Sequence, residues 1–558
     1  MSELERVGSR DMHFFQLIRQ EMRGTLRRLI VISSIAGASN AAALGAINSS
    51  AQTSGNEGTS VWMAGAFAVS LFVFVKTQDY LLVATTNEIG AIVHRLQSRL
   101  ADEVRQSELV MLEGIGRPAI LTAILGHTTT LTQAAQSLAL AGQGFVMLFF
   151  VGIYIAYLSP LIFTMSAIMI GMIIWVIHVM NRAHSAGAIE SSGLEDRMLN
   201  RLTDFLDGFR EIRLNHARSE ELFDDTIEVS RQAANIRIRT QSDTFRGTIF
   251  TQSSLYGLLG IVVFVLPRFG DVEGDAIAKV TLPLLFLVGS CFGAVQAIPV
   301  IAAANAATDG IMRIESRLRS ARTAASVSPS APRREFNEIR LHDIVFHRDE
   351  PSTDTLFQVG PLNFTLHSGD IVFITGGNGS GKSTFLKLLA GLYEPLSGDI
   401  TFDGVRVNAR TRQDYHELMA AIFSDFHLFQ RPYGIAAAEL NEVDRLLTYF
   451  ELDRKTGLVE GEFTTLDLSS GQRKRLALVI GLLENRPILL LDEWTAEQDP
   501  EFRRTFYQDF LPELKRSGTT VVMITHDELE IEELSFPSRR LRMDEGRFVE
   551  RHTTEIGV

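Results

Sequence analysis

The first 325 residues contain six apolar runs, each close to the length of about 20 residues that a helix needs to cross a bilayer. Backbone polar groups inside lipid must be hydrogen-bonded within their own segment, so apolar runs of this length fold as membrane-spanning helices. The runs are Leu29–Ile47, Val61–Val83, Leu138–Tyr157, Leu161–Met180, Ile249–Leu266 and Val280–Ala303. We therefore expect six transmembrane helices.

The charges between these runs indicate the orientation of the chain. Arg19, Arg23, Arg27 and Arg28 precede the first run, and the next loop, 48–60, has no Lys or Arg. Cytoplasmic loops are enriched in Lys and Arg, so we place the N-terminal end in the cytoplasm. The segments 84–132 and 181–246 contain arginines among apolar residues at helical spacing. They are predicted to extend the spans as long cytoplasmic helices.

The second run is unusual because it carries two opposite charges, Lys76 and Asp79. A charge at the centre of a span costs about 2.5–3.5 kcal/mol, whereas an apolar residue returns only about 0.3–0.6 kcal/mol. The two residues therefore lie near the cytoplasmic end of the span, or they face a wet cavity.

Length and charge divide the chain into two halves. Of the 558 residues, 1–325 have a net charge of -1 and 326–558 a net charge of -12. The total of -13 argues against a nucleic-acid-binding protein, and a single cysteine, Cys291, excludes an internal disulfide framework. The polar segment SVSPSAPRR, 326–334, is typical of a linker. We expect a transmembrane domain at 1–325, this linker, and a second domain at 335–558.

The second half contains a phosphate-binding loop. The short apolar run Ile371–Thr375 predicts a buried strand, and glycines with the spacing G-x4-G-K-S follow it directly. Backbone N–H groups in such a loop point at phosphate oxygens, and the next helix adds its positive N-terminal end. The lysine is expected to reach the β- and γ-phosphates, and the serine after it to ligate magnesium. The expected ATP-binding residues here are Gly376, Gly377, Asn378, Gly379, Ser380, Gly381, Lys382, Ser383 and Thr384.

A second buried strand ends in two carboxylates. The run Ile488–Leu491 is followed by Asp492 and Glu493. Asp492 is expected to hold Mg²⁺ together with Ser383. Glu493 is expected to orient or deprotonate the water that attacks the γ-phosphate.

The segment LSSGQRKR, Leu468–Arg475, makes the pattern specific. It resembles the signature motif of ATP-binding-cassette (ABC) ATPases, with Ser470 where glycine is more usual. Two further family marks follow in order, because Asp499 matches the D-loop aspartate and His526 the switch histidine. The resemblance implies that His526 acts with Glu493 in hydrolysis. It also implies that ATP bound to one cassette contacts the signature of a second cassette, through Ser469, Ser470, Gly471 and Gln472.

The resemblance covers essentially the whole chain. Six spans followed by one cassette form the layout of an exporter-type half-transporter. The expected fold is a membrane all-α six-helix transmembrane domain fused to a cytoplasmic α/β P-loop NTPase domain. Within the family, the chain is most similar to bacterial cyclic-peptide and siderophore exporters. The segments that carry this similarity are LDEWTAEQDPEFRRTFY (Leu491–Tyr507), IFSDFHLF (Ile422–Phe429) and DGFREIRLN (Asp207–Asn215).

The sequence departs from the wider family at two positions. The Q-loop glutamine is replaced by Ser424, whose shorter side chain cannot make the same reach to magnesium. The aromatic residue that stacks on adenine falls on about Arg348, whose planar guanidinium can also stack on a base. Phe346 or His347 is the alternative.

The resemblance implies an ATP hydrolase that uses ATP and Mg²⁺ to export a cyclic peptide, a siderophore or a related metabolite across the bacterial inner membrane. One chain supplies one phosphate loop and one signature, so a homodimer in contact with membrane lipid is expected, with a heterodimer as the alternative. Lipid or lipopeptide flipping, and a regulatory or sensor ATPase without cargo, remain open. No nucleic-acid partner is expected.

Overall fold

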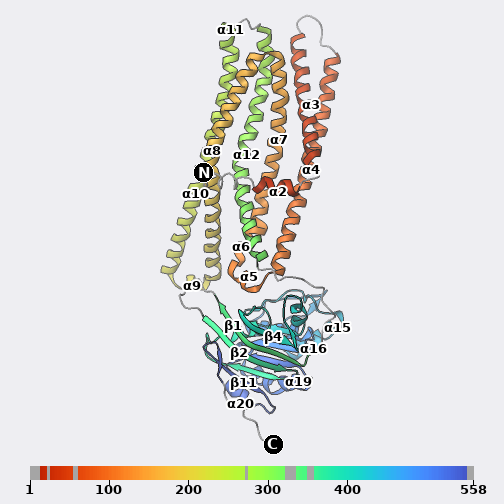
Figure 1. The fold of residues 1–558 in the computed structure, drawn as a ribbon, viewed down its shortest axis with the longest axis vertical. Coiled ribbons are helices and arrows are strands. Elements are labelled where there is room, and N and C mark those ends of the chain that lie inside the picture. The colour runs from red at the N-terminus through yellow and green to blue at the C-terminus, as the bar shows by residue number, and fades with distance from the viewer. Residues whose placement is uncertain are drawn as a thin grey trace. The chain divides into compact units, whose positions relative to one another are not determined.

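The computed structural model describes residues 13–21, 26–53, 61–269, 274–320, 335–348 and 357–549. These residues form two compact units, one within 1–107 and 111–321 and the other within 108–110 and 322–558. The expected linker, 326–334, lies outside the described residues. Each unit is described separately (Figure 1).

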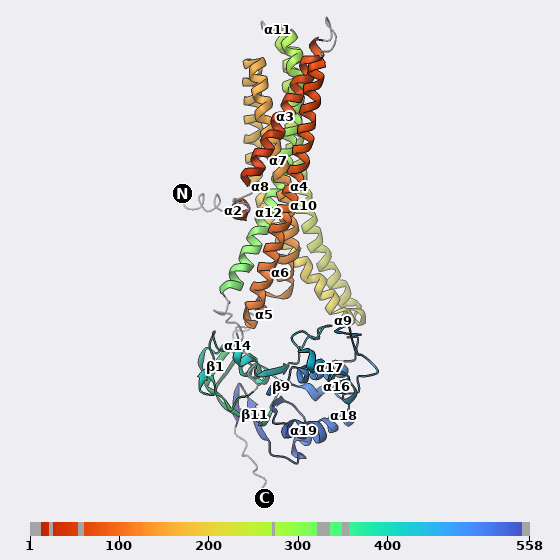
Figure 2. The ribbon, with the colours of Figure 1, turned by 90° about the vertical axis from the view of Figure 1, so that its right-hand side faces the viewer.

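The described residues of the first unit form helices joined by short turns. Its long helices lie side by side, with α3 beside α4, α7 beside α12, and α8 beside α10 (Figures 1 and 2). The helices are α2 (His13–Glu21), α3 (Leu26–Thr53), α4 (Val61–Gln106), α5 (Leu109–Ile115, partly in the second unit), α6 (Arg117–Leu121), α7 (His127–Leu158), α8 (Pro160–Asp207), α9 (Phe209–Leu214), α10 (His216–Gly260), α11 (Leu266–Phe269) and α12 (Gly274–Ser320). Short π-helical turns, η1 (Thr122–Gly126) and η2 (Ile261–Val265), interrupt this series.

Five of the six expected spans lie within α3, α4, α7, α8 and α12, and the remaining one, Ile249–Leu266, runs from α10 through η2 to the start of α11. By length and composition, five helices of the described residues can cross a membrane. The expected fourth span lies on α8, whose described apolar stretch, Pro160–Val176, is shorter than a full span. Most of these helices continue well beyond the length of a bilayer. α4 has 46 residues and α8 has 48, more than twice the roughly 20 that a span requires.

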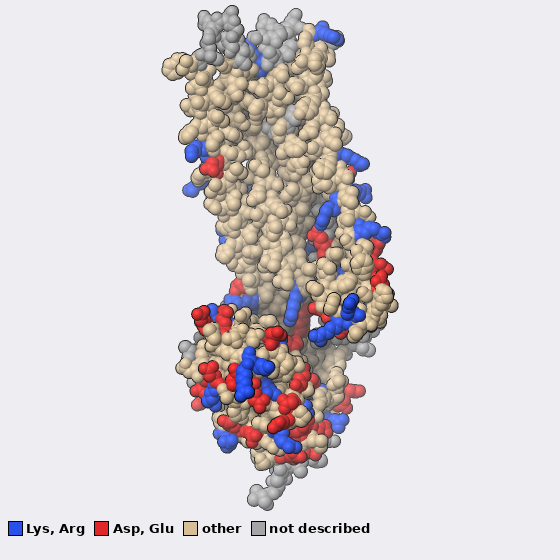
Figure 3. Space-filling view, turned by 180° about the vertical axis from the view of Figure 1, so that it is seen from behind, with Lys and Arg blue, Asp and Glu red and all other residues tan. Residues whose placement is uncertain are grey.

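The surface of this unit fits a lipid environment. On the face shown in Figure 3, the apolar helices carry few charged residues, whereas the surface of the second unit carries many of both signs. Lys76 and Asp79 are both exposed on α4, while Gln78 between them donates to Gln143 on α7 at 3.0 Å. The inward-facing polar group of this segment is thus an amide, and the two charges point outward.

The second unit is an α/β domain with two main sheets. One is antiparallel, in the order β2-β1-β4-β5; the other has the order β12-β11-β3-β10-β9-β6, and β11, β3, β10, β9 and β6 run parallel. The strands are β1 (Glu338–Arg348), β2 (Phe357–His367), β3 (Ile371–Thr375), β4 (Ser397–Phe402), β5 (Val405–Arg406), β6 (Met419–Ile422), β9 (Ile488–Asp492), β10 (Thr520–Ile524), β11 (Arg539–Asp544) and β12 (Arg547–Val549), with a separate pair β7 (Leu458–Val459) and β8 (Glu462–Phe463).

Helices enclose the parallel sheet. They are α13 (Lys382–Leu389), α14 (Arg412–His416), α15 (Ala437–Leu440), α16 (Val443–Tyr449), α17 (Ser470–Leu483), α18 (Pro500–Thr505), α19 (Leu511–Arg516) and α20 (Glu528–Glu532), with the short turns η3 (Trp494–Glu497) and η4 (Phe506–Phe510). The central strands β9 and β10 are buried at every residue, as expected for parallel strands covered on both faces.

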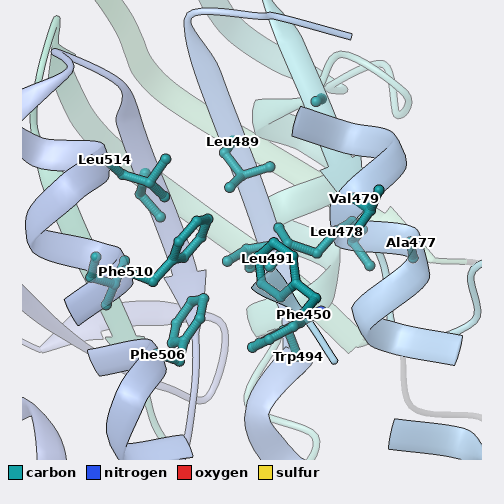
Figure 4. Packing of buried hydrophobic residues seen from close by; sticks show 14 of the residues in the cluster. Phe450, Ala477, Leu478, Val479, Leu489, Leu491, Trp494, Phe506, Phe510 and Leu514 are labelled. Atoms are coloured by element: carbon teal, nitrogen blue, oxygen red, sulfur yellow. The ribbon is translucent and has the colours of Figure 1, made fainter. Parts of the chain in front are cut away.

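Alternate residues of the central strands belong to two different hydrophobic clusters. Leu489 and Leu491 pack with α17 and with the aromatic side chains Phe450, Trp494, Phe506 and Phe510 on one face (Figure 4). On the other face, Ile488 and Leu490 pack with residues of α13 and of the antiparallel sheet. This double packing fixes the strand ends, from which the candidate site is built.

Candidate functional site

The predicted phosphate loop lies between β3 and α13, at the carboxyl end of a buried strand. Gly376 has φ +148°, and a Cβ atom there would lie 2.1 Å from the carbonyl oxygen of Met543. No other residue fits that position, because contacts under 3 Å with backbone atoms cannot be relieved by a side-chain rotation. The glycine therefore lets the loop begin against β11, and its curled backbone leads into the N-terminus of α13.

The side chain of Lys382 lies across this loop. Its Nζ donates to the carbonyl oxygens of Gly376 at 3.1 Å and Gly377 at 2.9 Å, and the residue is only 5% exposed. Among the described residues, the hydrogen-bond partners of this buried ammonium are neutral carbonyls. Anionic oxygens would suit it better, since hydrogen bonds between charged groups are the stronger ones.

Ser383 and Asp492 meet as expected. Ser383 Oγ donates to Asp492 Oδ1 at 3.2 Å, and Asp492 is 1% exposed. Burial raises the pKa of Asp492, and hydrogen bonds from Ser383 and Ser424 partly offset this. Asp492 Oδ2 is buried and has no hydrogen-bond partner of good geometry. Because Mg²⁺ prefers oxygen ligands and keeps several waters, a serine hydroxyl and a carboxylate with a spare oxygen suit it.

Ser424 follows β6, whose residues Ala420 to Ile422 pair with Leu489 to Leu491 of β9. Its backbone and its side chain lie close enough to Asp492 to oppose the rise in the pKa of that carboxyl. The shorter side chain at the Q-loop position is thus directed at the carboxylate of Asp492. The sequence alone did not reveal this partner.

Glu493 and His526 are brought together at the ends of neighbouring strands. Glu493 has φ +51°, a left-handed conformation that is uncommon for residues other than glycine and recurs at functional sites. Its N–H donates to the carbonyl oxygen of Ile524 at 3.0 Å, which ties the end of β9 to β10. His526 Nε2 lies 3.3 Å from Glu493 Oε1, and both side chains are partly open to solvent.

These residues share one edge of the parallel sheet. The strands β3, β10, β9 and β6 are consecutive neighbours in the sheet. The phosphate loop follows the carboxyl end of β3, His526 follows that of β10, Glu493 that of β9 and Ser424 that of β6. This edge is where open α/β sheets bind their ligands. Four segments that are far apart in sequence therefore converge on one location.

The signature segment begins α17. Ser469 caps this helix, since Gln472 N donates to Ser469 Oγ at 3.4 Å and Ser469 N donates to Gln472 Oε1 at 3.1 Å. Gln472 thus has a structural role that the sequence analysis did not assign. A Cβ atom on Gly471 would lie 2.7 Å from the carbonyl oxygen of Glu497, so only glycine allows this close approach. The hydroxyl of Ser470 lies near the carboxylate of Glu497 and lowers its pKa.

Each carboxylate oxygen of Asp499, the expected D-loop residue, makes a contact within the chain. Its Oδ1 accepts from Phe502 N at 2.8 Å and caps α18, and its Oδ2 pairs with Arg475 Nη2 at 2.5 Å. The hydrogen bond from Phe502 and the guanidinium of Arg475 lower the pKa of Asp499. The carboxylate therefore fixes the turn between η3 and α18 to the signature helix.

The adenine contact expected at Arg348 stays a prediction. Arg348 ends β1 and pairs with Phe357 of β2, but its side chain lies outside the described residues. Phe346 is 5% exposed and stacks on Tyr393 with ring centroids 4.9 Å apart, so it is already in use. Phe357, which the sequence analysis missed, is 38% exposed, and its Cζ would lie 3.4 Å from a Cβ on Gly381. Its ring is therefore an exposed aromatic beside the phosphate loop.

Two buried polar groups near Glu493 were also missed. Lys474, 6% exposed, donates through Nζ to the carbonyl oxygen of Glu493 at 2.9 Å. Trp494 is fully buried, and its Nε1 donates to the carbonyl oxygen of Lys474 at 2.8 Å. Lys474 lies two residues after Gln472, and Trp494 directly follows Glu493, so both lie beside motifs that the sequence shows. Their contacts with each other and with Glu493 depend on how α17 packs.

The fold and the site define an ABC ATPase domain joined to membrane-spanning helices. A family model described as "ABC transporter" matches residues 359–496. The ATP-binding protein SyrD of Pseudomonas syringae pv. syringae is 32% identical over 457 residues, covering 78% of this chain and 79% of that protein. The chain therefore belongs to the ABC transporter family, and it couples ATP hydrolysis to transport as a multi-pass protein of the inner membrane.

Two further comparisons bear on the architecture. The ATP-dependent lipid A-core flippase of Haemophilus ducreyi is 31% identical over 233 residues, which is 39% of this chain and 38% of that protein. A structure of a bacterial Atm1-family ABC exporter with ATP bound aligns with a TM-score of 0.75 and 18% identity, over 96% of this chain and 95% of that one. The chain thus has the fold of an ABC exporter half-transporter.

Proposed function

We propose that the chain binds ATP and Mg²⁺ at the carboxyl edge of its parallel sheet and that Glu493 activates the water that attacks the γ-phosphate. The observation that carries this proposal is the convergence of Lys382, Asp492, Glu493 and His526 at the ends of neighbouring strands. In this account, the loop from Gly376 to Thr384 binds the phosphates.

The roles follow from the contacts of each side chain. Lys382 exchanges its carbonyl partners for β- and γ-phosphate oxygens, and Ser383 and Asp492 hold Mg²⁺. When bound there, Mg²⁺ would supply positive charge to offset the negative charge that develops on the phosphates. Glu493 accepts the proton of the attacking water, and His526 holds the carboxylate and the γ-phosphate in register. For the base, we propose that Phe357 contributes to the adenine contact beside Arg348.

We further propose that two copies of the chain form a homodimer with two composite sites. The signature residues Ser469 to Gln472 lie at the N-terminus of α17, which suits them to bind an anion. In the dimer, this helix end faces the phosphate loop of the partner. Lys382, Asp492, Glu493 and His526 are all present, so each copy supplies a complete half-site.

The dimer can be tested by cross-linking, because the sole cysteine, Cys291, is buried in the helical unit. With Cys291 replaced by Ser, Asn378→Cys and Ser470→Cys in one chain are expected to form a disulfide between copies when ATP is added in the presence of a mild oxidant such as copper phenanthroline, which takes up the two electrons. The control is the same pair with Lys382→Ala, which is expected not to cross-link. A chain that stays monomeric and does not cross-link, whether or not ATP is present, would contradict the composite site.

The proposed boundaries are a transmembrane domain at 1–325, a linker at 326–334 and the cassette at 335–558. We propose export of a cyclic peptide, a siderophore or a related metabolite as the cargo activity. The segments Leu491–Tyr507, Ile422–Phe429 and Asp207–Asn215, which resemble exporters of this kind, support this choice over lipid flipping. The similarity to the flippase covers 39% of the chain.

The activity is tested in liposomes that contain the purified chain with its cassettes outward. A fluorescent cyclic lipopeptide and a labelled phospholipid serve as the two probes. ATP-dependent accumulation of the peptide in the lumen, absent with Glu493→Gln, is the expected result. Movement of the phospholipid alone would favour a flippase, and ATP hydrolysis without movement of either probe would favour a sensor ATPase.

A further inference from the structure

The segment Leu491–Tyr507 contains side chains for which the proposed hydrolysis has no use. Three of them reach one carboxylate, that of Asp527. Thr495 Oγ1 donates to Asp527 Oδ2 at 2.5 Å, and Tyr507 OH donates to the same oxygen at 3.1 Å. Arg503 Nη1 lies 3.4 Å from Asp527 Oδ1. Asp527, which these three side chains contact, directly follows His526 in the chain.

The hydrogen bonds of this cluster are mutually consistent. Tyr507 OH donates to Asp527, so at its 3.1 Å contact with Thr525 Oγ1 it accepts. Thr525 Oγ1 in turn accepts from Asp527 N at 3.0 Å. Each hydroxyl therefore donates once. Thr495, Tyr507 and Thr525 are each at most 2% exposed, and burial raises the pKa of Tyr507, which keeps its phenol protonated and able to donate near neutral pH.

The cluster connects the two segments that carry the catalytic pair. Thr495 lies two residues after Glu493, and Asp527 lies one residue after His526, so their hydrogen bond spans from one segment to the other. The pair itself is not held by burial, because the side chains of His526 and Glu493 are 48% and 35% exposed. A contact between two solvent-accessible side chains depends on the rigidity of the backbone beneath it.

We infer that Tyr507, together with Thr495 and Arg503, positions His526 against Glu493 by holding Asp527. Tyr507 is a positioning residue, because it acts through Asp527 and is itself buried behind the sheet edge. The inference deepens the proposed function and rests on its assignment of Glu493 and His526. A displacement of about 1 Å in a reacting group can lower a rate by about 100-fold, so loosening this cluster should slow hydrolysis.

The chain provides a matched control for the test. Tyr415 is also fully buried, and its OH donates to the carbonyl oxygen of Leu389 at 2.5 Å. Tyr507→Phe and Tyr415→Phe each remove one buried phenol hydroxyl and keep the ring. Both are expected to lower the thermal unfolding midpoint of the full chain by similar amounts. Only Tyr507→Phe is expected to reduce kcat for ATP, by about fivefold or more, with KM unchanged.

Thr495→Val gives a second, independent test, since it removes the other hydroxyl while keeping the shape of the side chain. We expect the same loss of kcat with KM unchanged. If Tyr507→Phe does not accumulate as folded protein, Thr495→Val alone decides. The inference is overturned if the kcat of these variants matches that of Tyr415→Phe, or if KM rises in proportion to any loss.

The proposed function has its own readout in the same assay. Full turnover by Glu493→Gln would overturn the assignment of the catalytic base, whatever Tyr507→Phe does. If Glu493→Gln is inactive and Tyr507→Phe hydrolyses ATP like the wild type, the proposed function stands and only the positioning role fails.

Discussion

His526 Nε2 lies 3.3 Å from Glu493 Oε1, and the two residues follow the neighbouring strands β10 and β9. The contact joins an imidazole to the carboxylate that is best placed to accept a proton from water. The left-handed backbone at Glu493 turns its side chain out of the buried strand, and the N–H of Glu493 remains bonded to β10. The fold itself therefore brings the pair together, which lowers the cost of organising the site during hydrolysis.

Replacing Lys382 by Ala is expected to weaken ATP binding. The buried ammonium would lose its contact with phosphate oxygens, and a hydrogen bond between charged groups contributes about 1.5–3 kcal/mol, or about 10- to 100-fold in Kd. Equilibrium binding of a fluorescent ATP analogue measures the change. Lys387→Ala is the control on the same helix, since Lys387 Nζ contacts Tyr393 OH at 3.4 Å and leaves the loop intact. Equal affinities for the two variants would contradict the phosphate-loop assignment.

Asp492→Asn is expected to raise thermal stability and to abolish Mg²⁺-dependent hydrolysis. Burial raises the pKa of Asp492, so the folded state binds its proton more tightly than the unfolded state does. The stability from this group is complete below the unfolded pKa of about 3.9 and is lost as pH rises through the folded pKa. An asparagine at this position carries no charge at neutral pH, so the variant avoids the loss of stability that ionisation of Asp492 causes.

The measurement for Asp492→Asn is the unfolding midpoint with Mg²⁺ chelated, at a series of pH values. The variant should unfold at a higher temperature than the wild type at pH 7, and the difference should shrink as the medium becomes acidic. Adding Mg²⁺ and ATP should stabilise the wild type and not the variant. A lower midpoint for the variant at pH 7 would contradict this prediction.

Gly471→Ala is expected to reduce ATP hydrolysis strongly. The added methyl group would lie 2.7 Å from the carbonyl oxygen of Glu497, so the start of α17 would have to move away from η3. Overpacking of this kind costs about 1–3 kcal/mol. Gly457→Ala is the matched control, because nothing lies within 4 Å of its added methyl group. Both ATPase rate and unfolding midpoint should fall for Gly471→Ala, and unchanged values would show that α17 and η3 are not tightly fitted.

Much of the site could be predicted from the sequence because its residues are local to strand ends. The glycine spacing before Lys382 predicts a phosphate-binding loop, and the carboxylates after Leu491 predict a magnesium site. The structure places Ser383 of the loop against Asp492. The expected spans likewise lie on long helices, because a run of apolar residues is recognisable without its neighbours.

The tertiary contacts could not be predicted. The contact of Ser424 with Asp492 depends on the pairing of β6 with β9, and the cluster around Asp527 depends on the packing of η4. None of these pairings leaves a periodic signal in the sequence.

The most direct test of the account is the rate of ATP hydrolysis by Glu493→Gln, measured together with nucleotide retention in the full chain. The amide keeps the shape of the side chain but cannot accept the proton of the attacking water. General-base catalysis contributes about 100-fold or more, so we predict that hydrolysis falls by at least that factor while ATP remains bound and closed dimers accumulate. Hydrolysis at the wild-type rate would contradict the central claim.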